Sequence, residues 1–206
     1  MTRVLDLVRA WLFPPACVAC DAPGPALCAD CAPSARDAIA FDVDGIPAFA
    51  LGAYDGALRR AIVALKRGER DPIPALADLL ARCAPVEGTL IPVATTRARA
   101  AQRGFDQSVQ VARRLAACRG VGCAEVLVKR GGPQAGLGRR ARLAAAGRFG
   151  LRPGSLPGTA TLLDDVCTTS ATLRDAVSVL RAAAVDVRRI VVIARADGTP
   201  GRQMRS

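Results

Sequence analysis

The 206-residue sequence contains no histidine, and only 3% of its residues are aromatic. The absence of histidine excludes Ser-His-Asp and Cys-His catalysis, and it excludes metal binding through imidazole. Any acid–base chemistry must then come from Asp, Glu, Tyr, Lys or Cys, or from a substrate. Hydrophobic residues make up 51% of the chain, so the core must be built mainly from Ala, Val, Leu and Ile.

Long apolar runs are absent as well. No uncharged stretch reaches the roughly 18 residues that suggest a membrane-spanning helix. The first 13 residues are apolar but are interrupted by Asp6 and Arg9, and no small-residue cleavage site follows them. This pattern predicts an amphipathic helix rather than a signal peptide. We therefore expect a protein without a membrane span, located in the cytoplasm.

The positive charge of the chain is concentrated in one segment. The formal net charge is +11. Between Thr95 and Arg152 there are 13 Lys and Arg residues against two acids, Asp106 and Glu125, whereas the rest of the chain holds 16 of each sign. A localised basic segment favours an anionic partner, either a polyphosphate or a nucleic acid. The alternative is a general bias of composition toward Arg and Ala.

Four cysteines near the amino terminus have the spacing of a metal site. Cys17, Cys20, Cys28 and Cys31 form C-x2-C-x7-C-x2-C within a Pro-rich segment that shows no helical or strand periodicity. Two such CxxC pairs can supply four thiolates to one tetrahedral Zn²⁺. Four thiolates leave no open coordination position, so we expect a structural zinc. The alternative is a pair of redox-labile disulfides, which a cytosolic setting disfavours.

Apolar periodicity predicts alternating helices and strands after the cysteines. Helices are expected over 1–13, 56–67, 74–83, 105–118, 143–146 and 171–183. Strands are expected over 47–54, 89–93, 124–128, 159–163 and 187–194, and a Gly-rich loop over 131–138. This order favours an α/β fold with a parallel sheet and helices on both faces. We divide the chain into an N-terminal helix and zinc module (1–36), an α/β domain (37–196) and a polar tail (197–206).

The most informative segment is TLLDDVCTTSATL, from Thr161 to Leu173. An apolar strand leads into two adjacent carboxylates, Asp164 and Asp165, and a loop of small and hydroxyl residues follows before the next helix. A strand that feeds a helix through such a loop leaves backbone N–H groups where a phosphate can bind. The two acids beside it could hold a ribose diol or a metal-bound sugar phosphate. In parallel sheets, ligands bind at this end of the strands.

Several segments in the same order resemble a known family. They are Phe13-Pro14-Pro15 before the cysteines, Tyr54-Asp55-Gly56 with Leu58-Arg59 and Leu65-Lys66, Ile91-Pro92-Val93, Arg99 with Arg103-Gly104-Phe105-Asp106-Gln107-Ser108, and Arg130, Gln134, Leu137, Arg142 and Phe149. Together they resemble the competence protein F (ComF-like) phosphoribosyltransferases over nearly the whole chain. The acidic segment is similar to the motif with which type I phosphoribosyltransferases bind phosphoribosyl pyrophosphate (PRPP).

The resemblance implies a type I phosphoribosyltransferase fold that binds PRPP or another sugar phosphate with Mg²⁺. It implies transfer of the phosphoribosyl group to an acceptor that the sequence does not identify. By resemblance, Asp164 and Asp165 hold the ribose hydroxyls. The implied binding residues are Thr168, Thr169, Ser170, Ala171 and Thr172 for the 5′-phosphate, Thr95, Thr96 and Arg97 for the pyrophosphate, and Arg99 and Arg103 for its departing charge.

Four positions differ from the family pattern. Ser170 replaces the usual Gly, Asp106 the usual Asn, Ala94 a Pro and Ala145 an Asn. A glycine at position 170 would let the backbone approach a phosphate without a side chain.

Two other functions remain open from the sequence. The chain could be a non-catalytic competence or DNA-uptake factor that binds a helicase-like partner or single-stranded DNA. The scarcity of aromatic residues for base stacking favours a protein partner over direct stacking on DNA. It could also be a PRPP- or nucleotide-sensing regulator that keeps the fold without turnover.

Overall fold

The computed structural model describes residues 16–129 and 148–196. Within them, five strands form the central sheet in the order β1-β2-β7-β6-β3. β2 (Ile46–Ala53), β7 (Asp186–Arg195), β6 (Thr159–Cys167) and β3 (Thr89–Pro92) run parallel, and β1 (Ile39–Val43) pairs antiparallel with β2 at one edge. The predicted helices over 1–13 and 143–146, the Gly-rich loop over 131–138 and the tail over 197–206 lie outside the described residues.

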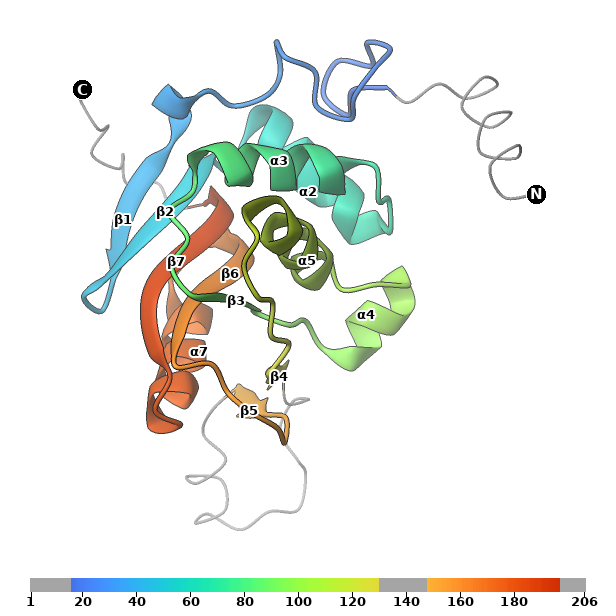
Figure 1. Cartoon of the computed structure of the whole chain (residues 1–206). Helices are drawn as coiled ribbons and strands as arrows, with labels where there is room; N and C mark the ends of the chain where they lie inside the picture. Colours follow the sequence, from blue (N-terminus) through green and yellow to red (C-terminus); the bar gives the residue numbers. More distant parts are fainter. Residues whose placement is uncertain (1–15, 130–147, 197–206) are drawn as a thin grey trace.

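Helices cover both faces of this sheet (Figure 1). α2 (Gly56–Arg67), α3 (Pro72–Cys83) and α5 (Gln107–Arg119) pack on one face, and α7 (Ala171–Ala182) packs on the other. The sequence alternates to match, because neighbouring side chains on a strand point to opposite faces. Leu163 of β6 lies in the core under α2, α3 and α5, whereas Leu162 lies in the core under α7. The predicted α/β class is therefore confirmed.

An edge hairpin was not predicted from the sequence. Asp44 and Gly45 join β1 to β2 with positive φ angles of 52° and 80°. An Asp-Gly pair between apolar segments favours this kind of two-residue turn, because both central residues need a positive φ. The Asp42 carboxylate also accepts a hydrogen bond from the Gly45 N–H at 2.8 Å. The signal was thus present in the sequence.

The strand predicted over 124–128 is wrong in its placement. Residues 122–124 run beside β3, where Ala124 N–H donates to the Leu90 carbonyl at 2.9 Å. The chain then leaves the central sheet, and β4 (Leu127–Lys129) pairs antiparallel with β5 (Phe149–Leu151) in a sheet of its own. A short apolar run does not reveal its partner strand, and here Phe149 packs onto the core under α7.

The connection after β3 is also more regular than predicted. It forms a short helix, α4 (Arg97–Arg103), before α5 begins. Thr96 caps α4 by accepting a hydrogen bond from the Arg99 N–H, and Asp106 caps α5 by accepting one from the Val109 N–H. Side-chain oxygens in these positions satisfy N–H groups that have no partner within the helix. The two caps place α4 and the start of α5 at the carboxyl edge of the sheet.

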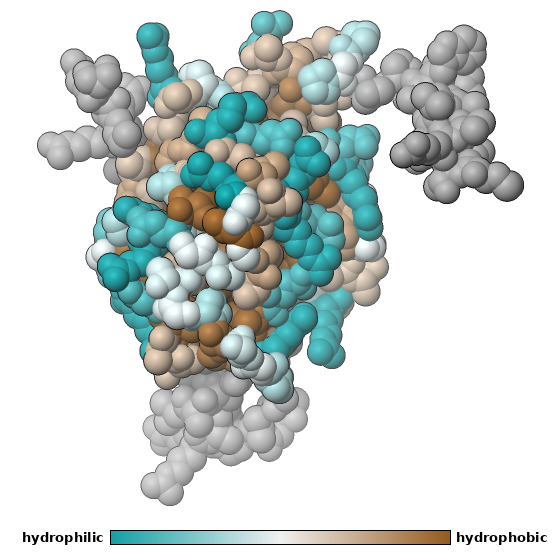
Figure 2. Space-filling view, viewed as in Figure 1, coloured by the Kyte–Doolittle hydropathy of each residue, from teal (hydrophilic) through white to brown (hydrophobic). Residues whose placement is uncertain are grey.

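Helices α2 and α3 lie between the four-cysteine segment and β3 (Figure 1). The buried Leu27 of this segment, with Val18 and Ala32, packs against the core that α2 and α3 cover. Figure 2 shows hydrophilic residues spread over the viewed face of the described part, with small hydrophobic areas between them. In the described part of the chain, no helix is long and apolar enough to cross a membrane.

Candidate functional site

Asp164 and Asp165, the acid pair, lie within β6 rather than in the loop after it. The predicted strand ended at residue 163, but β6 continues to Cys167. Because side chains alternate along a strand, Asp164 points to the face that α7 covers and Asp165 to the face that α2 and α5 cover. The two carboxylates are adjacent in sequence but lie in different surroundings.

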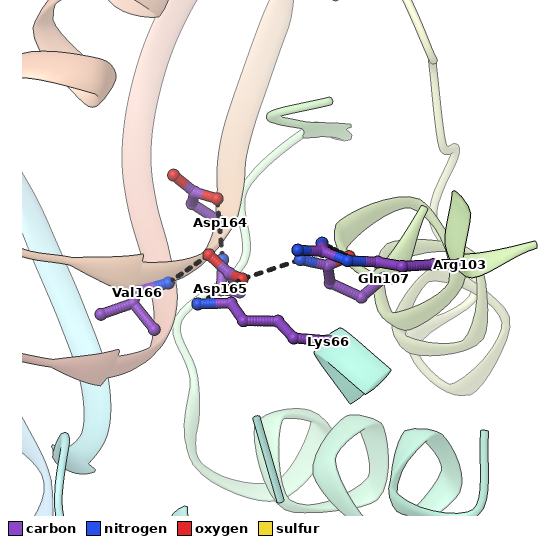
Figure 3. Close-up of polar contacts among 6 residues, drawn as sticks. All are labelled: Lys66, Arg103, Gln107, Asp164, Asp165 and Val166. Atoms are coloured by element: carbon purple, nitrogen blue, oxygen red, sulfur yellow. Dashed lines mark hydrogen bonds and ion pairs between the residues drawn. The ribbon is translucent and has the colours of Figure 1, made fainter. Parts of the chain in front are cut away.

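Asp165 is held by donors from two helices (Figure 3). Its Oδ2 accepts a hydrogen bond from Gln107 Nε2 at 2.9 Å and lies 3.4 Å from Lys66 Nζ. Gln107 is only 4% exposed, and its Oε1 accepts a hydrogen bond from Arg103 Nη1 at 2.8 Å. These contacts fix the orientation of the Asp165 carboxylate.

Asp164 has a less polar environment. It is buried, and its Oδ1 accepts a hydrogen bond from the Asp165 backbone N–H at 2.8 Å. Burial raises the pKa of Asp164 well above its usual value, and the nearby negative charge of Asp165 raises this pKa further. The positive charge of Lys129 opposes the shift. The acid pair therefore resists carrying two negative charges while no ligand or cation is bound.

The acid pair opens into a pocket of about 150 Å³, the acid-pair pocket. Its walls come from β6, the β3–α4 connection, α4, α5, β4, the start of α7 and the C-terminal end of α2. The lining residues are Lys66, Val93, Ala94, Thr95, Arg99, Arg103, Gln107, Ser108, Lys129, Asp164, Asp165, Val166 and Thr172. The pocket thus combines two carboxylates with four cationic side chains, which suits a ligand that has both hydroxyl and phosphate groups.

The pocket brings together six of the residues predicted from the sequence. They are Asp164, Asp165, Thr95, Arg99, Arg103 and Thr172. Arg97 lines a neighbouring cavity instead, and Thr96 caps α4. Thr168, Thr169, Ser170 and Ala171 form the β6–α7 connection and the first residue of α7, outside the lining of the pocket.

The β6–α7 connection contains an unusual backbone conformation at Ser170. Its φ is +58°, in the left-handed region that favours glycine, because a Cβ there approaches the backbone. The Ser170 Oγ lies 3.3 Å from the buried Cys167 Sγ. The resemblance to the ComF-like family predicts glycine at this position, and the backbone of Ser170 adopts a conformation that glycine favours.

The carboxylate of Asp106 is turned toward backbone donors. Its Oδ2 accepts a hydrogen bond from the Thr95 N–H at 2.7 Å, and its Oδ1 accepts the α5 capping bond from Val109 at 3.3 Å. Partial burial raises the pKa of Asp106, although these backbone N–H groups oppose the shift. The carboxylate therefore fastens the β3–α4 connection to the start of α5.

Lys66, Gln107 and Lys129 were not predicted as site residues. Lys66 and Gln107 belong to segments that carried the family resemblance, so a signal was present without a role attached to it. Lys66 reaches Asp165 from the last turn of α2, and its ammonium group also lies 5.8 Å from the centre of the Tyr54 ring. Lys129 ends β4, whose position next to the pocket depends on its pairing with β5.

The four predicted metal ligands come together in one cluster. The Sγ atoms of Cys17, Cys20, Cys28 and Cys31 all lie within 4.8 Å of one another, and those of Cys20 and Cys28 are 3.7 Å apart. Four sulfurs around one zinc ion at about 2.3 Å have sulfur–sulfur distances of about 3.8 Å. The cluster therefore fits one tetrahedrally coordinated metal ion.

The electrostatics of this cluster favour a cation. Burial raises the pKa of the Cys17 thiol, but backbone N–H groups of Cys28, Ala19 and Cys20 outweigh this effect and lower the pKa to about 6. The neighbouring sulfurs of Cys20 and Cys28 raise the pKa of Cys31 to about 12. A first thiolate forms readily, whereas a full set of four needs a bound cation to offset the repulsion between them.

Comparison with known protein families finds no matching family, and no curated protein sequence matches the chain. Among solved structures, the chain is similar to a UMP synthase from Leishmania donovani, with 14% sequence identity and a TM-score of 0.35. The matched region covers 81% of this chain and 30% of the UMP synthase chain. At this TM-score the similarity gives no conclusion about the activity of this chain.

Proposed function

We propose that this protein is a phosphoribosyltransferase-like protein of the ComF-like type, which binds PRPP or another ribose phosphate together with Mg²⁺. The observation that supports this most directly is the acid-pair pocket. There the two carboxylates of β6 face cationic side chains from three separate elements, α2, α4 and β4. A ribose ring that carries phosphate groups at both ends needs this combination of hydroxyl acceptors and positive charge.

In this proposal the acid pair binds the ribose 2- and 3-hydroxyl groups. Asp165, held by Lys66 and Gln107, accepts a hydrogen bond from one hydroxyl. Burial keeps the pKa of Asp164 high, so a protonated Asp164 can donate a hydrogen bond to the other hydroxyl. The β6–α7 connection, with the backbone N–H groups of residues 168–172, receives the 5′-phosphate as the sugar extends toward α7.

The transfer step replaces one bond at C1 of the ribose. The bond from C1 to the pyrophosphate oxygen breaks and its electron pair leaves with pyrophosphate, while a lone pair of the acceptor forms the new bond to C1. Arg99 and Arg103 line the pocket and would stabilise the charge that develops on the leaving group. Mg²⁺, when bound with the substrate, supplies further charge neutralisation. The absence of histidine does not prevent such a reaction, because positioning and charge stabilisation contribute most.

The four-cysteine cluster is proposed to hold a structural Zn²⁺. Its four sulfurs fill the coordination sphere and leave no position for a substrate. A reducing, cytoplasmic setting keeps such thiols available for the metal. The cluster would fix the amino-terminal segment against α2 and α3, where Leu27 is buried.

Calorimetry with PRPP and Mg²⁺ tests the proposal. The unmodified protein should bind PRPP. The double variant Asp164→Asn, Asp165→Asn should bind it about 100-fold more weakly, because the charge-assisted hydrogen bond to Asp165 and the hydrogen bond to Asp164 together are worth about 3 kcal/mol. Asp78→Asn is the matched control, because Asp78 lies on α3 in an exposed ion pair with Arg114. It should bind PRPP like the unmodified protein.

A pyrophosphate-release assay over a set of nucleobases then separates an enzyme from a sensor. The proposal fails if millimolar PRPP does not bind. A salt-dependent complex with single-stranded DNA that the double variant leaves unchanged would instead favour the non-catalytic alternative.

A further inference from the structure

A second cavity of about 240 Å³ adjoins the acid-pair pocket. It lies between α4, the first turn of α5 and the β4–β5 pair. Its lining residues are Pro92, Ala94, Thr95, Arg97, Ala100, Asp106, Val109, Gln110, Arg113, Glu125, Leu127, Val128, Lys129 and Arg152. Ala94, Thr95 and Lys129 also line the acid-pair pocket. A ligand in the second cavity would therefore contact the same connection that borders the proposed sugar site.

The acidic side chains of the second cavity are already engaged. Both carboxylate oxygens of Asp106 accept backbone N–H groups. Glu125 Oε1 accepts a hydrogen bond from Arg113 Nε at 2.6 Å, so these two charges offset each other. With four cationic side chains against these two acids, the lining of the second cavity has an excess of positive charge.

Two arginines of the cavity have no such partner. Within residues 16–129 and 148–196, the guanidinium groups of Arg97 and Arg152 make no hydrogen bond or ion pair. Arg97 begins α4, and Arg152 directly follows β5, where its backbone N–H donates to the Val126 carbonyl at 2.8 Å. Lys129 adds a third positive charge, 5.7 Å from the centre of the Phe149 ring. Three cations from separate elements therefore face one cavity.

Part of the remaining wall of the second cavity is apolar. Pro92, Val109, Leu127 and Val128 line it, and Leu127 and Pro92 are buried in the fold. An inorganic anion has no apolar part to place against such a wall, whereas a heterocyclic ring does. At about 240 Å³ the cavity is below the usual range of about 300–1,000 Å³ for drug-sized ligands. A single-ring molecule is the appropriate size.

We propose that the second cavity binds the acceptor, and that this acceptor is a small ring compound that carries a carboxylate. The ring lies against the apolar wall, and the carboxylate binds Arg97 and Arg152, because guanidinium groups recognise carboxylates through paired hydrogen bonds. The role of the second cavity as an acceptor site rests on the proposed function, whereas the preference of this cavity for an anionic ring does not. The leaving pyrophosphate is assigned to the other pocket, which has its own cations in Lys66, Arg99 and Arg103.

Nicotinate and nicotinamide are suitable probes, because they have the same ring and differ in the charge of one substituent. Affinities are measured by ligand-observed NMR titration, with and without saturating ribose 5-phosphate and Mg²⁺. The unmodified protein should bind nicotinate at least about 10-fold more tightly than nicotinamide. Arg152→Gln and Arg97→Gln should each remove most of this preference. Neither change should alter the affinity for ribose 5-phosphate by more than about twofold.

The matched control is Arg181→Gln. Arg181 is exposed near the end of α7, which runs away from the carboxyl edge of the sheet. This change should therefore alter neither the preference for nicotinate over nicotinamide nor the affinity for ribose 5-phosphate. Thermal unfolding of each variant shows whether it has folded, and Arg→Lys at the same positions, which keeps the charge, should restore part of the preference.

The outcomes separate the two proposals. Equal affinity for nicotinate and nicotinamide overturns the anionic-ring assignment, even if ribose 5-phosphate binds. A nicotinate preference that depends on Arg152 while ribose 5-phosphate fails to bind supports the cavity assignment and rejects the proposed function. If inorganic pyrophosphate binds and loses affinity with Arg152→Gln but not with Arg99→Gln, the leaving group occupies this cavity and the acceptor assignment is wrong.

Discussion

The four-cysteine cluster and the acid pair both bring together groups that repel one another when ionised, but the repulsion is compensated differently in the two sites. In the cysteine cluster, the four sulfurs lie within 4.8 Å of one another, and only a bound cation can offset the repulsion between four thiolates. In the acid pair, the protein provides the compensation itself. Asp165 forms an ion pair with Lys66 and accepts a hydrogen bond from Gln107. Asp164 is buried, and burial raises its pKa.

This difference indicates different roles. A cluster that needs a cation for its own stability is suited to a permanent structural metal. A carboxylate pair that is already compensated can exist empty and can exchange its internal donors for a ligand. Substitutions at the cysteine cluster and around the acid pair test these roles.

The largest effect is expected from Cys28→Ser. Removing one thiolate from the cluster should abolish stoichiometric zinc binding, because zinc-finger sites bind with roughly 10–16 kcal/mol and depend on the full ligand set. Elemental analysis of protein purified without chelator should give one zinc per chain for the unmodified protein and none for the variant. Cys118→Ser, at an exposed cysteine outside the cluster, should keep one zinc. Unmodified protein with four free thiols and no zinc would contradict the proposal.

Gln107→Leu should disturb the acid pair without touching its carboxylates. The change removes the hydrogen bonds that join Arg103 to Asp165 through Gln107. It should lower the free energy of unfolding by about 1–3 kcal/mol, because the partners in this partly buried site lose a donor or acceptor. Binding of ribose 5-phosphate should weaken by roughly 10-fold, since Asp165 is no longer fixed.

Gln102→Leu is the control for this change, because Gln102 is an exposed residue of α4. Chemical denaturation and calorimetry should show it close to the unmodified protein. If Gln107→Leu binds ribose 5-phosphate normally, the Gln107 contact is not required to position Asp165.

Asp164→Asn tests the pKa asymmetry of the acid pair through the pH dependence of stability. An acid whose pKa is raised by folding contributes stability below the pKa of the unfolded chain, about 3.9, and this contribution is lost as pH rises through the folded pKa. Burial and the charge of Asp165 cause the raised pKa of Asp164. Asn stays neutral throughout, so the Tm of the variant relative to the unmodified protein should rise from pH 4 toward pH 8. A constant difference in Tm over this range would mean that folding does not raise the pKa of Asp164.

Ser170→Gly should give the smallest effect. Ser170 adopts a φ of +58°, which costs a residue with a Cβ about 1–2 kcal/mol. Glycine relieves this strain but adds freedom to the unfolded chain, so the net gain in the free energy of unfolding should be below about 1 kcal/mol. Ser170→Val should instead destabilise by about 1–2 kcal/mol, because a β-branched residue fits this region poorly. Equal Tm values for the two variants would contradict the assigned backbone conformation.

Much of the fold was predictable because it depends on local patterns. The helix over 56–67 was predicted with the bounds that α2 has, since apolar residues recur at helical spacing between Asp55 and Gly68. The last strand and α7 were predicted within one residue at each end. The β1–β2 hairpin was missed although its Asp-Gly turn was visible. The β4–β5 pair could not be found, because strands of three residues carry too little pattern to identify their partner.

The groups that the proposed chemistry needs could be identified from the sequence: the four cysteines, the adjacent aspartates and the basic segment between residues 95 and 152. The tertiary structure decided how those groups differ from one another. It placed Asp165 against Lys66 and Gln107, buried Asp164, and moved Arg97 into a separate cavity with Arg152. pKa values and binding preferences depend on burial and on charges that are near in space, and such charges can be distant in the sequence. Lys66 and Asp165 are 99 positions apart in the chain, and Arg97 and Arg152 are 55 positions apart.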